Sequence, residues 1–164
     1  SLSDVALIAR RLTSVRATAS TKMEFQPRCF QHSAGLVMYY DAMNWLCLGK
    51  TFDEARQSAV LQLVRVDNGR KQDVPGTKVP VPMEGAVCLK VEIRDRSTLF
   101  FYSLDEGRLW KAVGESWDTS LFSDEYSAYG EFTGTFVGIC CVDADTRSLH
   151  ADFDWFEYED FIHP

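Results

Sequence analysis

The sequence has no long apolar run and no excess of basic residues, and each absence removes a class of function. No stretch of its 164 residues approaches the roughly 18 apolar residues that a membrane-spanning helix needs. Its 17 basic residues are outnumbered by 24 acidic ones, which gives a formal net charge of −7. Nucleic acid and anionic membranes both attract clustered Lys and Arg. We therefore expect neither as a partner, whereas a neutral ligand such as a sugar is unaffected by this balance.

Cysteine occurs in an odd number, which argues against a complete disulfide framework. Cys47, Cys88, Cys140 and Cys141 lie inside apolar, strand-like runs, and Cys29 lies outside them. This pattern favours free, buried thiols in a reducing compartment over disulfides. The start of the chain also lacks the basic-then-apolar order of a signal peptide. Together these features predict a soluble, cytoplasmic protein.

The familiar signatures of an active site are missing as well. The three histidines, His32, His150 and His163, are scattered, and none has another His or a Cys two or four residues away. This spacing argues against a zinc site. The sequence contains no Gly-rich phosphate loop, no G-x-S-x-G elbow and no Cys-His signature. These enzyme classes therefore have no support in the sequence.

The acidic residues offer two weaker candidates. Asp152 and Asp154 have the alternate spacing that places two carboxylates on one strand face, but Phe156 comes next and Glu157 is out of phase. Solvated strand carboxylates are therefore the favoured interpretation. The acidic turn DADTRS, 143–148, has oxygens that suit calcium, although such turns are common. We expect no catalytic residue and no cofactor in this chain, with a structural calcium as the open alternative.

Strand patterns dominate the chain. Alternation is clearest at 86–94, where Val87, Leu89, Val91 and Ile93 share one face and more polar residues share the other. Further runs rich in aromatic or β-branched residues occupy the opening stretch, 36–40, 45–49, 59–66, 98–104 and 151–158. Turn-forming residues separate these runs, as in DNGR at 67–70. About ten strands with short turns predict an all-β fold, an antiparallel two-sheet β-sandwich or jelly roll.

Two segments depart from this pattern without changing the fold class. The Pro-rich stretch 74–85 is typical of a long loop between strands, and 118–126 suggests one helical turn capped by Asp118 or Thr119. No internal repeat, low-complexity segment or linker divides the chain. Residues 1–164 are therefore expected to form a single domain.

The stretch FTGTFVGICC, 132–141, alternates rings with glycines. At the strand period of two, Phe132, Gly134, Phe136, Gly138 and Cys140 share one face. Glycines between rings leave room for something to approach the sheet. This face is therefore a candidate contact surface, with its glycines as gaps for a partner.

Aromatic side chains are the other candidates for function. Sugar rings have apolar C–H faces that stack on aromatic rings while their hydroxyl groups take polar partners. Most rings in a sandwich of this size belong to its core. Tyr39 and Tyr40, however, are adjacent in a strand, so one of them must leave the core. Tyr39, Tyr40 and Trp45 are the candidate sugar-stacking residues.

Seven segments, taken together and in order, resemble the carboxy-terminal β-sandwich of glycoside hydrolase family 43 β-xylosidases and α-L-arabinofuranosidases. The likeness covers nearly the whole chain, and seven segments in register make it specific. The segments are ALIARR (6–11), TKMEFQP (21–27), AGLVMYYD (34–41), VCLKVEI (87–93), FYSLDEGRLW (101–110), SDEYSAYGEFTGTFVGICCVD (123–143) and HADFDWFEY (150–158).

This resemblance implies a concanavalin A-like accessory domain, cut from a larger glycosidase whose upstream five-bladed propeller carries the catalytic carboxylates. The implied parent protein is an exo-acting β-xylosidase that trims xylo-oligosaccharides or arabinoxylan side chains. The sandwich would pack on the propeller and lend a phenylalanine to the rim of its active site, and Phe132 is the expected residue, with Phe136 behind it. The propeller would determine whether the substrate is a xyloside or an arabinofuranoside. Members of the family also suggest that the protein forms a homo-oligomer.

The sequence also departs from the family pattern. A further strand usually precedes 6–11, so one sheet edge is expected to be exposed or completed by residues outside the chain. The stretch 52–82 is the least family-like. The alternative function is a free-standing carbohydrate-binding module, in which an exposed row of Tyr and Trp grips a glycan.

Overall fold

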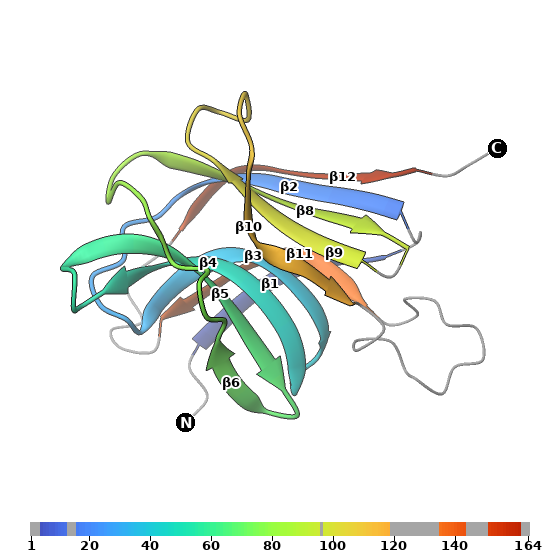
Figure 1. The fold of residues 1–164 in the computed structure, drawn as a ribbon, viewed down its shortest axis with the longest axis horizontal. Helices are drawn as coiled ribbons and strands as arrows, with labels where there is room; N and C mark the ends of the chain where they lie inside the picture. Colours follow the sequence, from blue (N-terminus) through green and yellow to red (C-terminus); the bar gives the residue numbers. More distant parts are fainter. Residues whose placement is uncertain (1–3, 13–15, 96, 119–134, 144–150, 162–164) are drawn as a thin grey trace.

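The computed structural model describes residues 4–12, 16–95, 97–118, 135–143 and 151–161. Within these ranges the chain forms twelve strands and no helix (Figure 1). The strands are β1 (Asp4–Arg11), β2 (Arg16–Glu24), β3 (His32–Asp41), β4 (Asn44–Asp53), β5 (Ser58–Asp67), β6 (Arg70–Asp73), β7 (Val79–Pro80), β8 (Ala86–Arg94), β9 (Ser97–Ser103), β10 (Lys111–Asp118), β11 (Phe136–Asp143) and β12 (Asp152–Asp160). The described residues contain no helix long and apolar enough to cross a membrane.

The strands form two antiparallel sheets, stacked as two layers in Figure 1. The seven-stranded sheet has the order β1-β11-β3-β4-β5-β6, with β7 also paired to β5. The five-stranded sheet has the order β10-β9-β8-β2-β12. The predicted two-sheet β-sandwich is therefore confirmed.

The core lies between the two layers. In β8 the predicted apolar face is buried, since Val87, Leu89, Val91 and Ile93 are 0–2% exposed. Leucines of β3, β4 and β5 meet this face from the seven-stranded sheet. Each fully buried side chain of this kind stabilises the fold by about 1.5–3 kcal/mol. The pairing of two apolar faces is what holds the layers together.

Cation–π contacts join the layers near both edges of the sandwich. The Arg10 guanidinium of β1 lies 4.1 Å from the centre of the Tyr158 ring in β12. The Arg65 guanidinium of β5 lies 5.6 Å from the Trp117 ring in β10. Such contacts contribute about 0.5–1 kcal/mol at exposed sites.

In the described part of the chain β1 is an edge strand, and its Ile8 is 73% exposed.

Turn chemistry follows the sequence closely. Asn68 and Gly69 have φ values of 50° and 81°, which is the two-residue geometry of a type I′ hairpin between β5 and β6. The predicted turn at 67–70 is therefore confirmed.

Several strands were not evident from the sequence. In β2 the core-facing positions are mostly small or polar, as in Ala17, Ala19 and Thr21, so the apolar alternation is hidden. The predicted loop 74–85 contains the two-residue strand β7, which pairs with β5. Asp118, a proposed helix cap, ends strand β10, and the rest of 118–126 lies outside the described residues.

Strand β12 contains a bulge between Phe153 and Trp155. The bulge adds one residue to β12, so the in-and-out alternation of its side chains shifts by one position beyond it. Glu157 therefore pairs with Ser20, just as Asp152 pairs with Glu24, and both lie on the side away from the core. The expectation that Glu157 faces the other way is therefore wrong. The side chain of Asp154 is 49% exposed and lies 3.6 Å from the Lys22 ammonium, as expected of a solvated strand carboxylate.

All five cysteines are free thiols in the structure. Cys47, Cys88 and Cys140 are buried, whereas Cys29 and Cys141 are half-buried. The reducing, cytoplasmic location inferred from these residues stays a prediction.

Candidate functional site

The seven-stranded sheet has a second face, turned away from the core, which we call the outer face. Three aromatic residues lie side by side on it, because Phe136 of β11 pairs with Tyr39 of β3, and Tyr39 pairs with Trp45 of β4. We call these three the aromatic row. Tyr39 and Trp45 pack on a small cluster of Val37, Cys47 and Cys140.

The alternation predicted for the aromatic strand residues is confirmed. Tyr40 packs against the main core, while Tyr39 packs against the cluster on the outer face. In β11, Val137 is fully buried in the core, whereas the neighbouring Phe136 is half-buried. Of the five candidate residues, Tyr39, Trp45 and Phe136 are thus brought together and Tyr40 is separated from them.

The remaining candidate, Phe132, lies outside the described residues, as does Gly134. Gly138 is described, and it leaves no gap for a partner. A Cβ atom there would lie 2.5 Å from the Cα of Ala9 in the adjacent strand β1. The interpretation of Gly138 as a gap is therefore wrong, because strand β1 fills that space.

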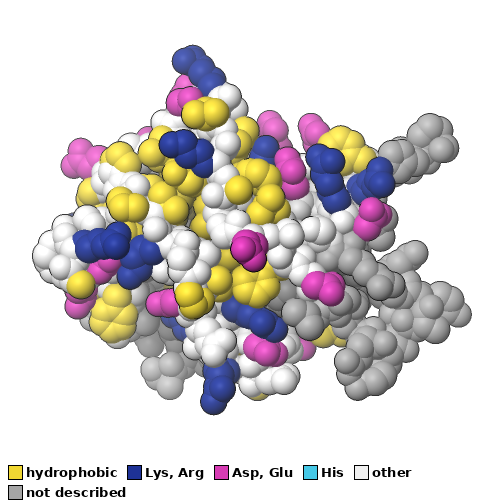
Figure 2. Space-filling model, viewed as in Figure 1, with side chains coloured by type: hydrophobic (Ala, Val, Ile, Leu, Met, Phe, Trp, Pro, Cys, Tyr) yellow, Lys and Arg dark blue, Asp and Glu magenta, His cyan; other side chains and the backbone are white. Residues whose placement is uncertain are grey.

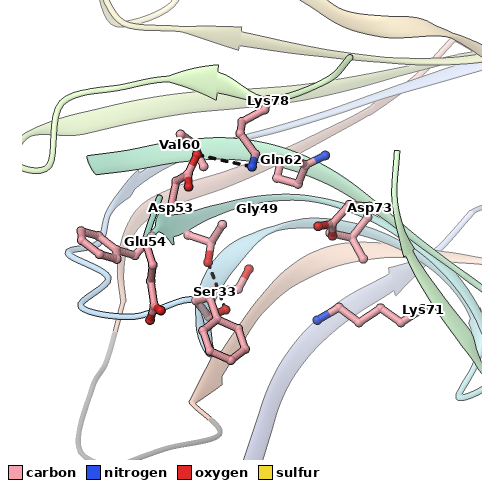
Figure 3. Close-up of a pocket in the computed structure, with 13 residues that line it drawn as sticks. Ser33, Gly49, Asp53, Glu54, Val60, Gln62, Lys71, Asp73 and Lys78 are labelled. Atoms are coloured by element: carbon pink, nitrogen blue, oxygen red, sulfur yellow. Dashed lines mark hydrogen bonds and ion pairs between the residues drawn. The ribbon is translucent and has the colours of Figure 1, made fainter. Parts of the chain in front are cut away.

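A cleft opens on the outer face beside the small cluster (Figure 3). The segment 74–81 crosses over β5 and walls one side, since the Gln62 amide donates hydrogen bonds to the Thr77 hydroxyl (2.7 Å) and the Val74 carbonyl (3.1 Å). The cleft has a volume of about 210 Å³. No feature of the sequence indicated this cleft, because its residues come from 30–33, 49–54, 60–64 and 71–78.

The opposite sheet presents a different outer face, on which two lysines already have partners. The Lys90 ammonium lies 4.8 Å from the centre of the Phe101 ring and 4.4 Å from that of Trp110. The Lys22 ammonium lies 2.9 Å from the Glu106 carboxylate, and the hydrogen bond to Glu106 raises the pKa of Lys22. These two ammonium groups are therefore less available to a ligand on the five-stranded sheet.

Charges of both signs are mixed on the face shown in Figure 2. Lys and Arg side chains are interspersed there with Asp and Glu. The expectation that nucleic acid is not a partner stays a prediction.

Metal binding has no support in the described ranges. They contain no group of three or more His, Cys, Asp or Glu residues that could hold an ion. The turn 143–148, considered for calcium, lies outside the described residues apart from Asp143 at the end of β11.

Comparison with known proteins identifies the domain. The family model described as "Beta xylosidase C-terminal Concanavalin A-like domain" matches residues 1–159. The chain belongs to this family. This confirms both the resemblance to glycoside hydrolase family 43 enzymes and the concanavalin A-like fold that it implied.

Relatives of the β-xylosidase C-terminal domain are much longer proteins. The domain described here is 36% identical over 157 residues to a beta-xylosidase of Bacillus subtilis. The alignment covers 94% of the domain and 29% of that relative. The domain is 35% identical over 155 residues to a putative beta-xylosidase of Escherichia coli, covering 93% and 28%. The crystal structure of a xylan beta-1,4-xylosidase from Bacillus halodurans superposes with a TM-score of 0.86 at 34% identity, covering 96% of the domain and 30% of that chain. The domain thus spans less than a third of these relatives.

Proposed function

We propose that the domain is the non-catalytic, carboxy-terminal accessory part of an exo-acting β-xylosidase. The observation that supports this most directly is length, because relatives named as β-xylosidases are more than three times as long as the domain. Their remaining residues are enough for a separate catalytic domain. The partner is then a five-bladed propeller in the same polypeptide, and the substrate is a xylo-oligosaccharide or arabinoxylan side chain bound through it.

The aromatic row is the surface that would meet this catalytic domain. A sandwich needs one apolar face per sheet, and Tyr39, Trp45 and Phe136 form a second apolar face with the Cys47–Cys140 cluster beneath them. Exposed apolar surface of this kind is typical of an interface between domains. Leu7, which pairs with Cys140 from the neighbouring edge strand, extends the same surface. Assembly of several copies through these domains stays a prediction.

Phe132 and Phe136 are the proposed aromatic contribution to the rim of the active site. Phe136 is the first residue of β11, and its ring lies at the end of the aromatic row. Phe132 precedes it by four residues. An aromatic ring at the rim would stack on the apolar face of the terminal sugar and exclude water from it.

Turnover of nitrophenyl β-xyloside by the full-length protein tests this proposal. We expect Phe132→Ala and Phe136→Ala to lower kcat/KM by about 2- to 10-fold, because an aromatic contact contributes about 0.5–1.5 kcal/mol beyond its area. The control is Phe161→Ala, since Phe161 is 49% exposed and follows β12 in the other sheet. Unchanged kinetics in both variants would refute the rim assignment, and turnover by the domain alone would refute the accessory role.

A free-standing carbohydrate-binding module is the second candidate, supported by the partial exposure of Tyr39 and Trp45 on the outer face. Titration calorimetry of the domain with xylo-oligosaccharides distinguishes the two functions. Saturable binding that is lost in Trp45→Ala would favour the binding module.

A further inference from the structure

We propose that the cleft on the outer face is a second carbohydrate site, which holds one neutral sugar ring of an oligosaccharide apart from the catalytic centre. The proposal rests on the proposed function only for the choice of a xylose-based ligand. The cleft itself is built by β3, β4, β5 and β6 together with the segment 74–81.

The size of the cleft suits a single sugar ring. Its volume of about 210 Å³ is below the roughly 300–1,000 Å³ of sites for drug-sized molecules. Gly49 keeps the floor open, because it has no side chain and a Cβ atom there would lie 2.5 Å from the Ser33 hydroxyl oxygen. Phe30 lines the cleft and is 63% exposed, so its ring is free to stack on an apolar sugar face.

One wall of the cleft is a closed polar network. The Asp53 carboxylate accepts the backbone N–H of Ala55 (3.1 Å) and of Arg56 (3.4 Å), and it lies 3.4 Å from the Lys78 ammonium. Removal from solvent would raise the pKa of Asp53, but these N–H groups and Lys78 together hold it below its usual range. Asp53 is therefore paired with Lys78 and with the Arg56 guanidinium (3.6 Å), and its contact with Lys78 holds the segment 74–81 in place.

Four further polar side chains of the cleft have no such partners. Within the described part of the chain, the side chains of Ser33, Glu54, Lys71 and Asp73 make no hydrogen bond or ion pair. Figure 3 shows the Lys71 ammonium pointing across the cleft toward Ser33, with Asp73 above it. The cleft therefore offers an ammonium donor, a carboxylate acceptor and a hydroxyl group that can serve as either.

This set of groups selects a neutral, hydroxyl-rich ligand. The carboxylates of Asp53, Glu54 and Asp73 balance the ammonium groups of Lys71 and Lys78 and the Arg56 guanidinium, which lies 3.6 Å from Asp53, so the cleft has no positive excess that would favour an anion. The described residues contain no three-ligand group for a metal ion. A sugar satisfies both signs, since each hydroxyl group donates and accepts, and its C–H face suits Phe30.

The cleft runs along the outer face from the aromatic row to the far end of β4. Its Lys71 end borders the row, because Lys71 pairs with Val66 and Val66 pairs with Trp45. Its other end lies far from the row, since Asp53 is eight positions after Trp45 in β4, which is about 27 Å along an extended strand at ~3.4 Å per residue. A catalytic domain seated on the aromatic row would therefore leave the Asp53 end of the outer face accessible. The same polypeptide would then hold one part of an oligosaccharide in the cleft and present another to the active site.

Calorimetry of the full-length protein with a thio-linked, non-hydrolysable xylo-oligosaccharide tests the proposal. We expect two classes of site, one of which weakens at least tenfold in the double variant Phe30→Ala/Asp73→Asn. Both residues are exposed, so the fold should persist, and an unchanged melting temperature verifies this. The matched control Leu109→Ala truncates a side chain that is 59% exposed in the turn after β9 and should retain both sites.

Each other outcome is informative. A single class of site, or a second class unaffected by the double variant, would overturn the proposal. Titration with inorganic phosphate or calcium chloride in place of the sugar should give no signal that depends on Phe30 and Asp73, and such a signal would overturn it as well. Loss of the second site with unchanged xyloside turnover supports the cleft. Absence of turnover with the second site intact would refute the proposed function and leave the cleft standing.

Discussion

The thiol sulfurs of Cys47 and Cys140 lie 3.6 Å apart although a complete strand separates their backbones. β3 lies between β11 and β4, and at the position opposite Cys140 it carries Gly35, which has no side chain to keep the two thiols apart. The hydrogen bond with the Cys140 thiol, together with burial, raises the pKa of the Cys47 thiol well above its usual range. The pair behaves as a buried apolar contact that links three strands.

We predict that mild oxidation does not join Cys47 to Cys140. Strands two positions apart in a sheet are separated by about 9.5 Å, whereas a disulfide needs Cα atoms within about 7 Å. Thiol titration of the denatured protein after oxidant treatment should still find the pair reduced. In the native protein, the half-buried Cys29 and Cys141 should be alkylated before the buried Cys47 and Cys140. A peptide map with a Cys47–Cys140 crosslink would contradict this prediction.

Lys50 should make the stability depend on alkaline pH. Its side chain is 1% exposed, its ammonium donates to the Met83 carbonyl at 2.9 Å, and burial lowers its pKa despite the nearby Glu24. Above the lowered pKa the folded chain loses this proton, whereas the unfolded chain keeps it up to the ordinary value of 10.5. The unfolded state then binds more protons, so the free energy of unfolding contributed by Lys50 rises with pH in that interval.

The measurement is urea unfolding of the unaltered domain and of Lys50→Met over a series of alkaline pH values up to 10.5. The difference in free energy of unfolding between the two should change across the series, because only the unaltered domain carries this titration. Parallel curves would show that Lys50 keeps its ordinary pKa in the folded state.

Gly138→Ala should destabilise the domain more than Gly49→Ala. At Gly138 the new Cβ meets the backbone of β1, with the Ala9 Cα at 2.5 Å, and a paired strand cannot move aside without breaking its ladder. At Gly49 the nearest atom is the Ser33 hydroxyl oxygen, which can rotate away. Urea unfolding should give a loss of at least about 2 kcal/mol for Gly138→Ala and less than about 1 kcal/mol for Gly49→Ala. Equal losses would contradict the role assigned to strand β1.

Phe100→Ala should be among the more costly core substitutions. Phe100 of β9 is fully buried between the sheets, and removing a buried ring costs about 3–5 kcal/mol. Leu109→Ala, in the exposed turn that follows, should change the free energy of unfolding by less than about 0.5 kcal/mol. Equilibrium denaturation of both variants provides the comparison, and a loss below about 1 kcal/mol at Phe100 would mean that this position repacks.

Predictions from the sequence succeeded where the evidence was local. The alternation in β8 and the opposite orientations of Tyr39 and Tyr40 follow from the two-residue period of a strand. They failed where the partner strand decided the outcome. Gly138 is required by the close approach of β1, and the direction of Glu157 is reversed by a bulge in the pairing with β2. Strand β2 was not predicted, because its core residues, such as Ala17 and Ala19, are small and give no apolar alternation in the sequence.

The sequence alone determined the all-β class, the turn at Asn68-Gly69 and the family, because periodicity, turn residues and short segments are read along the chain. Only the tertiary structure placed Phe136 beside Tyr39 and formed the cleft on the outer face. These depend on strand order. Residues almost one hundred positions apart become neighbours when burial of the core faces fixes one register across the sheet.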